Sequence, residues 1–113
     1  MTSVDPDDTG LLAPGWAGSP AASATSDTAY LQALLDAEAA LTQAQAARDL
    51  APAEAATAVT EAADAARFDV RSLAERARGG GNPVIPLVAD LTKAVGEEYG
   101  LSLIHISEPT RPY

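Results

Sequence analysis

The sequence predicts an all-α fold, and three observations support this prediction. Hydrophobic residues make up 47% of the 113-residue chain, but alanine dominates them and aromatic residues contribute only 4%. Alanine favours helix and buries little area, which is typical of a helical domain with a thin core. Leucine and valine recur at helical spacing, and proline or glycine separates the segments that carry them.

Charge and composition exclude several classes of function. The net charge of −9 at pH 7 argues against nucleic acid or an anionic membrane as a partner. The absence of cysteine excludes disulfide and thiolate chemistry, and a single histidine gives no basis for a metal site. The acidic N-terminus is unlike a signal peptide, and no apolar run is long enough to span a bilayer. We therefore expect a cytoplasmic protein without membrane contact.

Residues 1–26 are expected to form an acidic, disordered start and then an irregular arm. Residues 1–10 are acidic and rich in turn-forming types. Two prolines and two glycines within residues 11–20 oppose a regular helix there. Because Leu11, Leu12 and Trp16 are apolar, we expect the arm to lie across a helical body with Trp16 as its anchor.

Residues 27–100 are expected to form the helical part of the chain. The first helix is predicted over residues 27–48, because Thr25, Ser26 or Asp27 can cap it and four leucines mark one face. Those leucines are Leu31, Leu34, Leu35 and Leu41. Glu38 lies on the same face, where its carboxylate either has a function or pairs with a cation on a neighbouring helix.

Three further helices are predicted over residues 53–66, 70–78 and 85–98. Pro52 fits the first position of the second helix, in which Val59 is the only large apolar residue, so this helix is expected to be peripheral. Asp69 can cap the third helix, and Pro86 fits the first turn of the fourth. The apolar stripe of the fourth helix consists of Leu87, Val88, Leu91 and Val95.

A Gly-Gly-Gly-Asn-Pro corner, residues 79–83, joins the last two helices. The three glycines are expected to end the third helix, and Pro83 disfavours the α conformation at Asn82. Such a corner brings bare backbone and an amide side chain to a helix N-terminus, which suits an anionic ligand. The alternative is a tight helix connection in which Asn82 caps its own turn, and composition alone favours this alternative.

The run FDVRSLAERARGGGNPVIPLVADL at residues 68–91 resembles the N-terminal region of bacterial 3-carboxy-cis,cis-muconate cycloisomerases, in the fumarase/aspartase superfamily. The positions that match the family motif are Gly81, Asn82, Ile85, Pro86, Leu87 and Val88. Residues 35–41, LDAEAAL, resemble another family helix, and the whole resemblance covers roughly residues 11–99. Relatives such as adenylosuccinate lyase usually carry a Thr-His-His corner where Gly81 to Pro83 stand here.

The resemblance implies the N-terminal part of a helical, homotetrameric enzyme that works without cofactor or metal. It would convert 3-carboxy-cis,cis-muconate to carboxymuconolactone in protocatechuate degradation, the β-ketoadipate pathway. Other active-site segments of the family, including one like GATSQD and a glycine-serine-rich loop, are missing from this chain. No catalytic residue is therefore assigned and the fragment is expected to be inactive alone. The family-matched candidates for contact with a small polycarboxylate substrate are Asn82 and Gly81.

Two alternatives stay open. One is a fragment of a sister lyase, such as an adenylosuccinate lyase-like enzyme. The other is a non-enzymatic helical interaction module whose leucine stripe binds another helix.

The tail at residues 101–113 differs in character from everything before it. It alternates apolar and polar residues like a strand, and LSLIHISEPTR resembles the translation of a transposase-type sequencing adapter. We therefore expect a non-native tail, so His105 is not a catalytic candidate. The alternative is a genuine short C-terminal strand.

Overall fold

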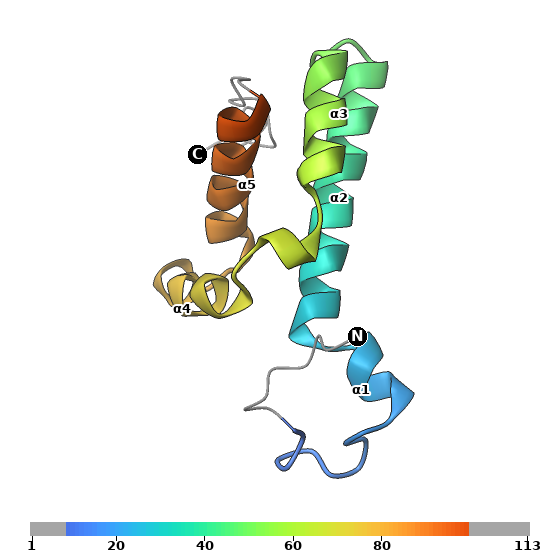
Figure 1. The fold of residues 1–113 in the computed structure, drawn as a ribbon, viewed down its shortest axis with the longest axis vertical. Coiled ribbons are helices and arrows are strands. Elements are labelled where there is room, and N and C mark those ends of the chain that lie inside the picture. The colour runs from blue at the N-terminus through green and yellow to red at the C-terminus, as the bar shows by residue number, and fades with distance from the viewer. Residues whose placement is uncertain (1–8, 100–113) are drawn as a thin grey trace.

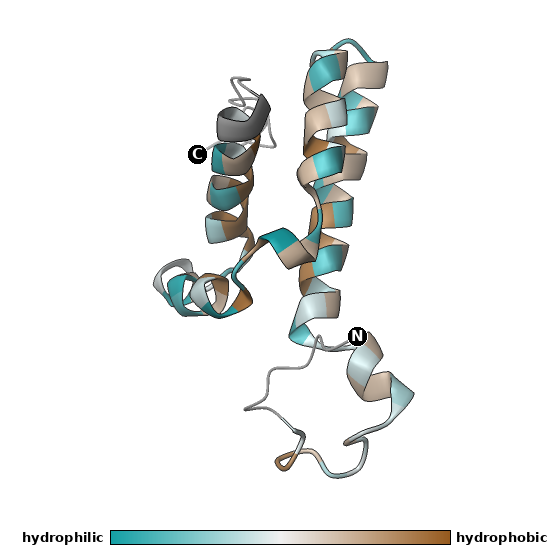
Figure 2. Ribbon diagram, viewed as in Figure 1, coloured by the Kyte–Doolittle hydropathy of each residue, from teal (hydrophilic) through white to brown (hydrophobic). Residues whose placement is uncertain are grey.

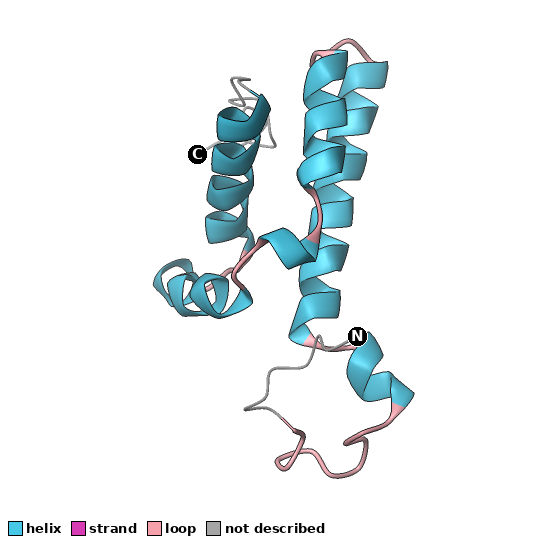
Figure 3. Cartoon of the chain, in the orientation of Figure 1, coloured by secondary structure: helices cyan, strands magenta, loops and turns pink. Residues whose placement is uncertain are grey.

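The computed structural model describes residues 9–99, and this part of the chain contains helices, turns and loops but no strand (Figure 3). The all-α prediction is therefore confirmed. The elements are α1 (Pro20–Ala24), α2 (Asp27–Ala47), α3 (Ala53–Ala62), the 3₁₀ helix η1 (Ala65–Arg67), α4 (Val70–Gly80) and α5 (Val84–Tyr99). The expected acidic start, up to residue 8, and the expected tail at 101–113 lie outside the described residues.

The helices form an elongated bundle around a hairpin. Helices α2 and α3 lie side by side as an antiparallel pair, and η1 leads from the end of α3 into α4 (Figure 1). Helix α4 crosses the base of the bundle and packs against α5, which runs back alongside the hairpin and contacts α3 (Figure 1). The corner between α4 and α5 is therefore at the same end of the bundle as the start of α2.

A small apolar core joins these helices. Figure 2 shows apolar residues on the side of α5 that faces the hairpin. The largest fully buried side chains are Leu35, Leu87, Leu91, Val59 and Val95. The stripe predicted for the last helix is thus the α5 side of this core, whereas Leu41 of the predicted α2 stripe remains 38% exposed.

The prediction that the second helix is peripheral is wrong. Val59 is fully buried, and the small residues Ala55, Ala56, Ala58 and Ala62 are buried with it. Alanines have no bulk to hold helices apart, so α3 approaches α2 closely and its single valine fills the remaining space. Side-chain size alone does not predict this burial, because burial also depends on how closely two helices can pack.

Two glutamine side chains connect α2 to the segment that follows it. Gln32 donates from Nε2 to the carbonyl of Ala63 (2.9 Å) and accepts at Oε1 from the amide of Ala65 (2.8 Å). Gln43 donates from Nε2 to Thr60 Oγ1 (2.9 Å) on α3. Gln32 thereby satisfies backbone groups left open where α3 ends at Ala62, which is earlier than the predicted residue 66. Asp64 then caps η1 by accepting from the amide of Ala66 (3.0 Å).

The arm differs from its prediction. A short helix, α1, begins at Pro20, where none was expected, and Ser19 caps it by accepting from the amide of Ala22 (3.3 Å). Trp16 is 59% exposed, so it is not an anchor on the helical body. Proline at the first helical position and serine before it are ordinary helix-start signals, and here they outweigh the glycines nearby.

Candidate functional site

The corner between α4 and α5 is the candidate site, and Gly81 shapes its first half. Gly81 adopts the left-handed conformation (φ 68°, ψ 19°) and ends α4. Its amide donates to the carbonyl of Ala77 (2.7 Å), and the amide of Asn82 donates to the same carbonyl (3.2 Å). Gly79 and Gly80 are the last residues of α4, so the prediction that all three glycines end the helix is wrong. Gly81 alone provides the positive φ that turns the chain.

Asn82 builds the second half of the corner by capping α5. Its Oδ1 accepts from the amide of Val84 (2.8 Å), and its backbone carbonyl accepts from the amide of Ile85 (3.4 Å). The structure therefore contains the turn in which Asn82 caps its own loop. The other half of the amide group, Nδ2, has no hydrogen-bond partner among the described residues, and Asn82 is exposed. The side chain thus serves as a cap and still presents a donor to solvent.

The backbone of the corner has no amide to spare for an anion. Pro83 and Pro86 carry no N–H, and the amide of Leu87 donates to the carbonyl of Pro83 (3.2 Å). With the bonds described above, every N–H from residue 81 to residue 87 has an acceptor. A ligand at this corner would therefore meet the side-chain amide of Asn82 rather than free backbone donors.

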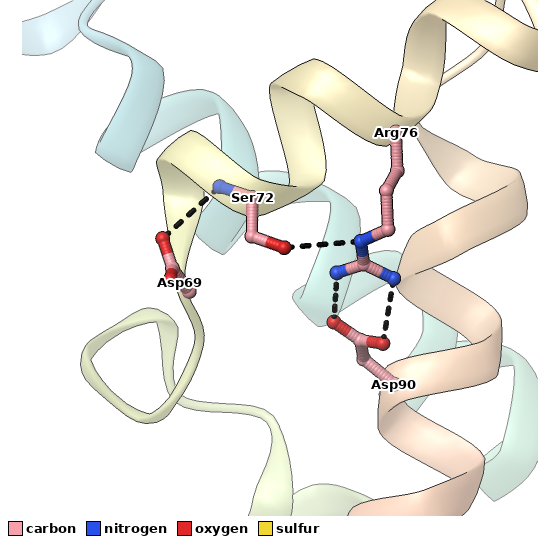
Figure 4. A network of polar contacts seen from close by, with 4 residues as sticks. All are labelled: Asp69, Ser72, Arg76 and Asp90. Carbon is pink, nitrogen blue, oxygen red and sulfur yellow. Dashed lines mark hydrogen bonds and ion pairs between the residues drawn. The ribbon is translucent and has the colours of Figure 1, made fainter.

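A charged clamp holds the two helices on either side of the corner. Arg76 on α4 donates from both terminal nitrogens to the carboxylate of Asp90 on α5 (3.0 and 2.6 Å; Figure 4). Its Nε donates to Ser72 Oγ (3.0 Å), and the amide of Ser72 donates to the cap residue Asp69 (3.0 Å). The predicted cap at Asp69 is confirmed. The clamp links α4 to α5 on one side of the corner.

The clamp also raises the pKa of its arginine. The hydrogen bond to Asp90 raises the pKa of Arg76 above its ordinary value, with smaller electrostatic contributions from Asp90 and Asp69. Each of the three guanidinium nitrogens donates one hydrogen bond, Nε to Ser72 and the two terminal nitrogens to Asp90. Arg76 consequently supports the corner rather than offering a free cation to a ligand.

An apolar groove lies beside the corner. It has a volume of about 300 Å³ and is formed by the start of α2, by α4 and by the start of α5. Two of its residues, Asp27 and Tyr30, are polar or partly polar. The lining residues are Asp27, Tyr30, Leu31, Leu34, Val70, Leu73, Ala74, Ala77, Pro83 and Leu87. The groove thus shares Ala77 and Pro83 with the turn that Gly81 and Asn82 make.

Sequence reasoning missed a set of buried polar residues on α2. Thr42 is 2% exposed and Gln45 is 9% exposed, and the Oε1 atom of Gln45 is buried without a hydrogen-bond partner. Thr42 Oγ1 donates to the carbonyl of Glu38 (2.9 Å), and Glu38 Oε1 is itself buried. The spacing of these residues, which continues the Leu31 and Leu35 face, is the signal that could have found them. Glu38 does not line the groove.

Residues 9–99 hold no cluster of histidine, cysteine, aspartate or glutamate side chains suited to a metal ion. None of the helices described here combines the length and apolarity needed to cross a bilayer.

Comparison with known proteins identifies relatives over most of the chain. It is 45% identical over 91 residues, 80% of this chain, to nitrosuccinate lyase of Streptomyces davaonensis. It is 44% identical over 87 residues, 77% of this chain, to 3-carboxy-cis,cis-muconate cycloisomerase of Bradyrhizobium diazoefficiens. It is 46% identical over 70 residues, 62% of this chain, to the cycloisomerase of Pseudomonas putida. The chain spans less than a fifth of each relative, between 17% and 19%. No protein-family model matches it.

Over most of its length, the helical chain is similar to one segment of enzymes of the fumarase/aspartase superfamily. The relatives include 3-carboxy-cis,cis-muconate cycloisomerases and a nitrosuccinate lyase. The predicted resemblance to 3-carboxy-cis,cis-muconate cycloisomerases is confirmed. The second name, nitrosuccinate lyase, was not anticipated from the sequence.

Proposed function

We propose that the chain is the N-terminal part of a fumarase/aspartase-type enzyme that converts 3-carboxy-cis,cis-muconate to carboxymuconolactone without cofactor or metal. The observation that carries this proposal is the similarity to cycloisomerases from three organisms, at 44%, 46% and 37% identity. The corner motif that resembles the same family adds support. The intact enzyme would be a cytoplasmic homotetramer.

A nitrosuccinate lyase reaction is the second candidate. It is favoured by the nitrosuccinate lyase relative, which is 45% identical to this chain over 91 residues. Both names denote substrates that carry more than one carboxylate. The two candidates therefore make the same demand on the corner, a hydrogen-bond donor for an anionic oxygen, and differ in the chemistry that follows.

Asn82 and Gly81 are the proposed substrate contacts. Because Oδ1 of Asn82 is held by the amide of Val84 (2.8 Å), the amide group has a fixed orientation and Nδ2 is the atom left to donate. A hydrogen bond from this nitrogen to a carboxylate is charge-assisted and stronger than a neutral one. Gly81 has no side chain, and no atom lies within 4 Å of the Cβ position that a side chain there would occupy. A ligand can therefore approach the corner on this side.

The rest of the active site must come from elsewhere in the enzyme. The chain has a net charge of −9, and the Arg76 guanidinium beside the corner is already paired with Asp90. A substrate with several carboxylates needs additional cations or donors near its other charges. We accordingly assign no catalytic group to this chain and expect it to show no turnover by itself.

The decisive assay supplies the protein encoded by the intact gene with each substrate separately. We expect 3-carboxy-cis,cis-muconate to be consumed and carboxymuconolactone to form, with no dependence on added metal. Turnover of nitrosuccinate alone would favour the second candidate. Turnover of neither substrate would contradict the proposal. The isolated 113-residue chain serves as the inactive control.

A further inference from the structure

The clamp lies a short distance along both helices from the corner. Arg76 is in α4, six residues before Asn82, and Asp90 is in α5, eight residues after it. At a rise of about 1.5 Å per residue, the clamp is roughly 9 Å from the corner along α4 and roughly 12 Å from it along α5. The two helices are thus joined covalently at the turn and by an ion pair further along (Figure 4).

Asn82 is attached to both of these helices. On the α4 side, its amide and that of Gly81 donate to the carbonyl of Ala77 (3.2 and 2.7 Å), the residue that directly follows Arg76. On the α5 side, its Oδ1 accepts from the amide of Val84 (2.8 Å). The direction of the remaining donor, Nδ2, therefore depends on how the two helices are oriented relative to each other.

The clamp is placed to control that orientation. A rotation of α5 against α4 about the corner moves Asp90 relative to Arg76, and with a lever of roughly 10 Å a displacement of about 1 Å corresponds to a rotation of about 6°. Two parallel hydrogen bonds, 3.0 and 2.6 Å long, oppose this displacement and also fix the plane of the guanidinium. The third nitrogen, Nε, donates to Ser72 Oγ (3.0 Å), so the arginine side chain is also tied to its own helix.

The exposure of the clamp indicates that orientation, rather than stability, is its main contribution. The Arg76 and Asp90 side chains are 43% and 31% exposed, and ion pairs at such positions add little to stability. Helices α4 and α5 also meet in the apolar core, to which Leu73, Leu87 and Leu91 belong. Loss of the ion pair should therefore leave the helices folded while their relative orientation becomes less restricted.

We propose that Arg76 and Asp90 are positioning residues for substrate binding, because their ion pair holds the corner in the orientation that directs Nδ2 of Asn82 at a substrate carboxylate. The inference rests on the proposed function, in which Asn82 contacts the substrate. Both clamp residues act through the asparagine rather than on the substrate itself. Because a hydrogen bond weakens steeply when its donor is turned away from the acceptor, the effect falls on binding.

The kinetics of the intact enzyme test this role. Asp90→Asn keeps the size of the side chain and removes its charge, so KM for whichever of the two substrates is turned over should rise by about three- to tenfold, with a smaller change in kcat. In an Asn82→Ala enzyme, which lacks the donor, Asp90→Asn should raise KM no further. Arg78→Ala is the matched control and should leave KM unchanged, because Arg78 is exposed and lies two residues beyond Arg76 on the same helix.

Hydrogen exchange of the intact enzyme provides a measurement that needs no substrate. The amides of Gly81 and Asn82 donate to Ala77 at the corner. They should exchange at least about threefold faster in Asp90→Asn than in the wild-type enzyme. The amide of Ala65, which donates to Gln32 away from the corner, should exchange at the same rate in both.

The outcomes separate this inference from the proposed function. A wild-type enzyme that turns over neither substrate contradicts the proposed function. Unchanged exchange at Gly81 and Asn82 in a folded Asp90→Asn variant would overturn the positioning role, whatever the reaction is. An unchanged KM in that variant would overturn it too. The same holds if Asp90→Asn raises KM equally with and without Asn82, since the clamp would then act through another group.

Discussion

Alanine substitution along the glycine run should separate three residues that look equivalent in the sequence. Gly79 and Gly80 are helical, whereas Gly81 holds a positive φ of 68°. No atom lies within 4 Å of a Cβ placed at Gly79, so Gly79→Ala should fit without displacement. The same substitution at Gly81 forces an L-residue into the left-handed region. The two variants should therefore change stability in opposite directions.

The magnitudes follow from the conformations. Replacing a helical glycine by alanine should raise the free energy of unfolding by about 0.5–1 kcal/mol. Alanine in the left-handed conformation at Gly81 should lower it by about 1–2 kcal/mol. Gly80→Ala should gain less than Gly79→Ala, because its Cβ would lie 2.7 Å from Cδ1 of Ile85. Ile85 is 52% exposed and can move its terminal methyl, so the contact should reduce the gain without reversing it.

Urea unfolding followed by far-ultraviolet circular dichroism measures these differences. Gly81→Asn is the matched control, because asparagine tolerates the left-handed conformation and should lose less stability than alanine. The reasoning would be refuted if Gly79→Ala and Gly81→Ala were destabilising to the same extent. That result would mean that the three glycines act together as one helix breaker.

Three other predictions concern the core and the polar contacts. Leu91→Ala should lower the free energy of unfolding by about 2–5 kcal/mol, whereas Leu50→Ala should change it by less than about 0.5 kcal/mol, as urea unfolding would show. Gln32→Ala should lower the free energy of unfolding by about 1–3 kcal/mol. It should also speed hydrogen exchange at the amide of Ala65, which donates to Gln32 Oε1. The free energies of unfolding of the single and double alanine variants of Arg76 and Asp90 should reveal a favourable coupling energy between the two side chains, and this coupling should weaken as salt is added. Because hydrogen bonding raises the pKa of Arg76, the guanidinium stays protonated as the pH rises above neutral, and the coupling should persist there.

Most helix starts could be predicted from the sequence because their causes are local. Ser26 and Asp69 each cap the helix that follows them, and Pro52 immediately precedes α3. Each signal consists of one residue and the amides within three positions of it. The short helix α1 carries the same kind of signal at Ser19, although the prolines and glycines around it argue against a helix.

Features that depend on contacts between helices could not be predicted in the same way. Full burial of Val59 results from alanines that let α3 approach α2, and no local pattern specifies that distance. The pairing of Arg76 with Asp90 depends on how α4 crosses α5. At the candidate site, the sequence predicts Asn82 and Gly81 as substrate contacts and leaves two roles open for the Asn82 side chain, a cap of its own turn or a contact with a ligand. The structure assigns Oδ1 of Asn82 to the cap and leaves Nδ2 available.

Exchange of Asn82 for aspartate in the intact enzyme tests the proposed site most directly. Aspartate caps a helix as well as asparagine does, so Asn82→Asp should leave the unfolding midpoint unchanged while replacing the donor Nδ2 by an anionic oxygen. The account predicts that KM for 3-carboxy-cis,cis-muconate rises at least about tenfold, as expected when a charge-assisted hydrogen bond to substrate is lost. An unchanged KM and kcat in a folded Asn82→Asp enzyme would contradict it.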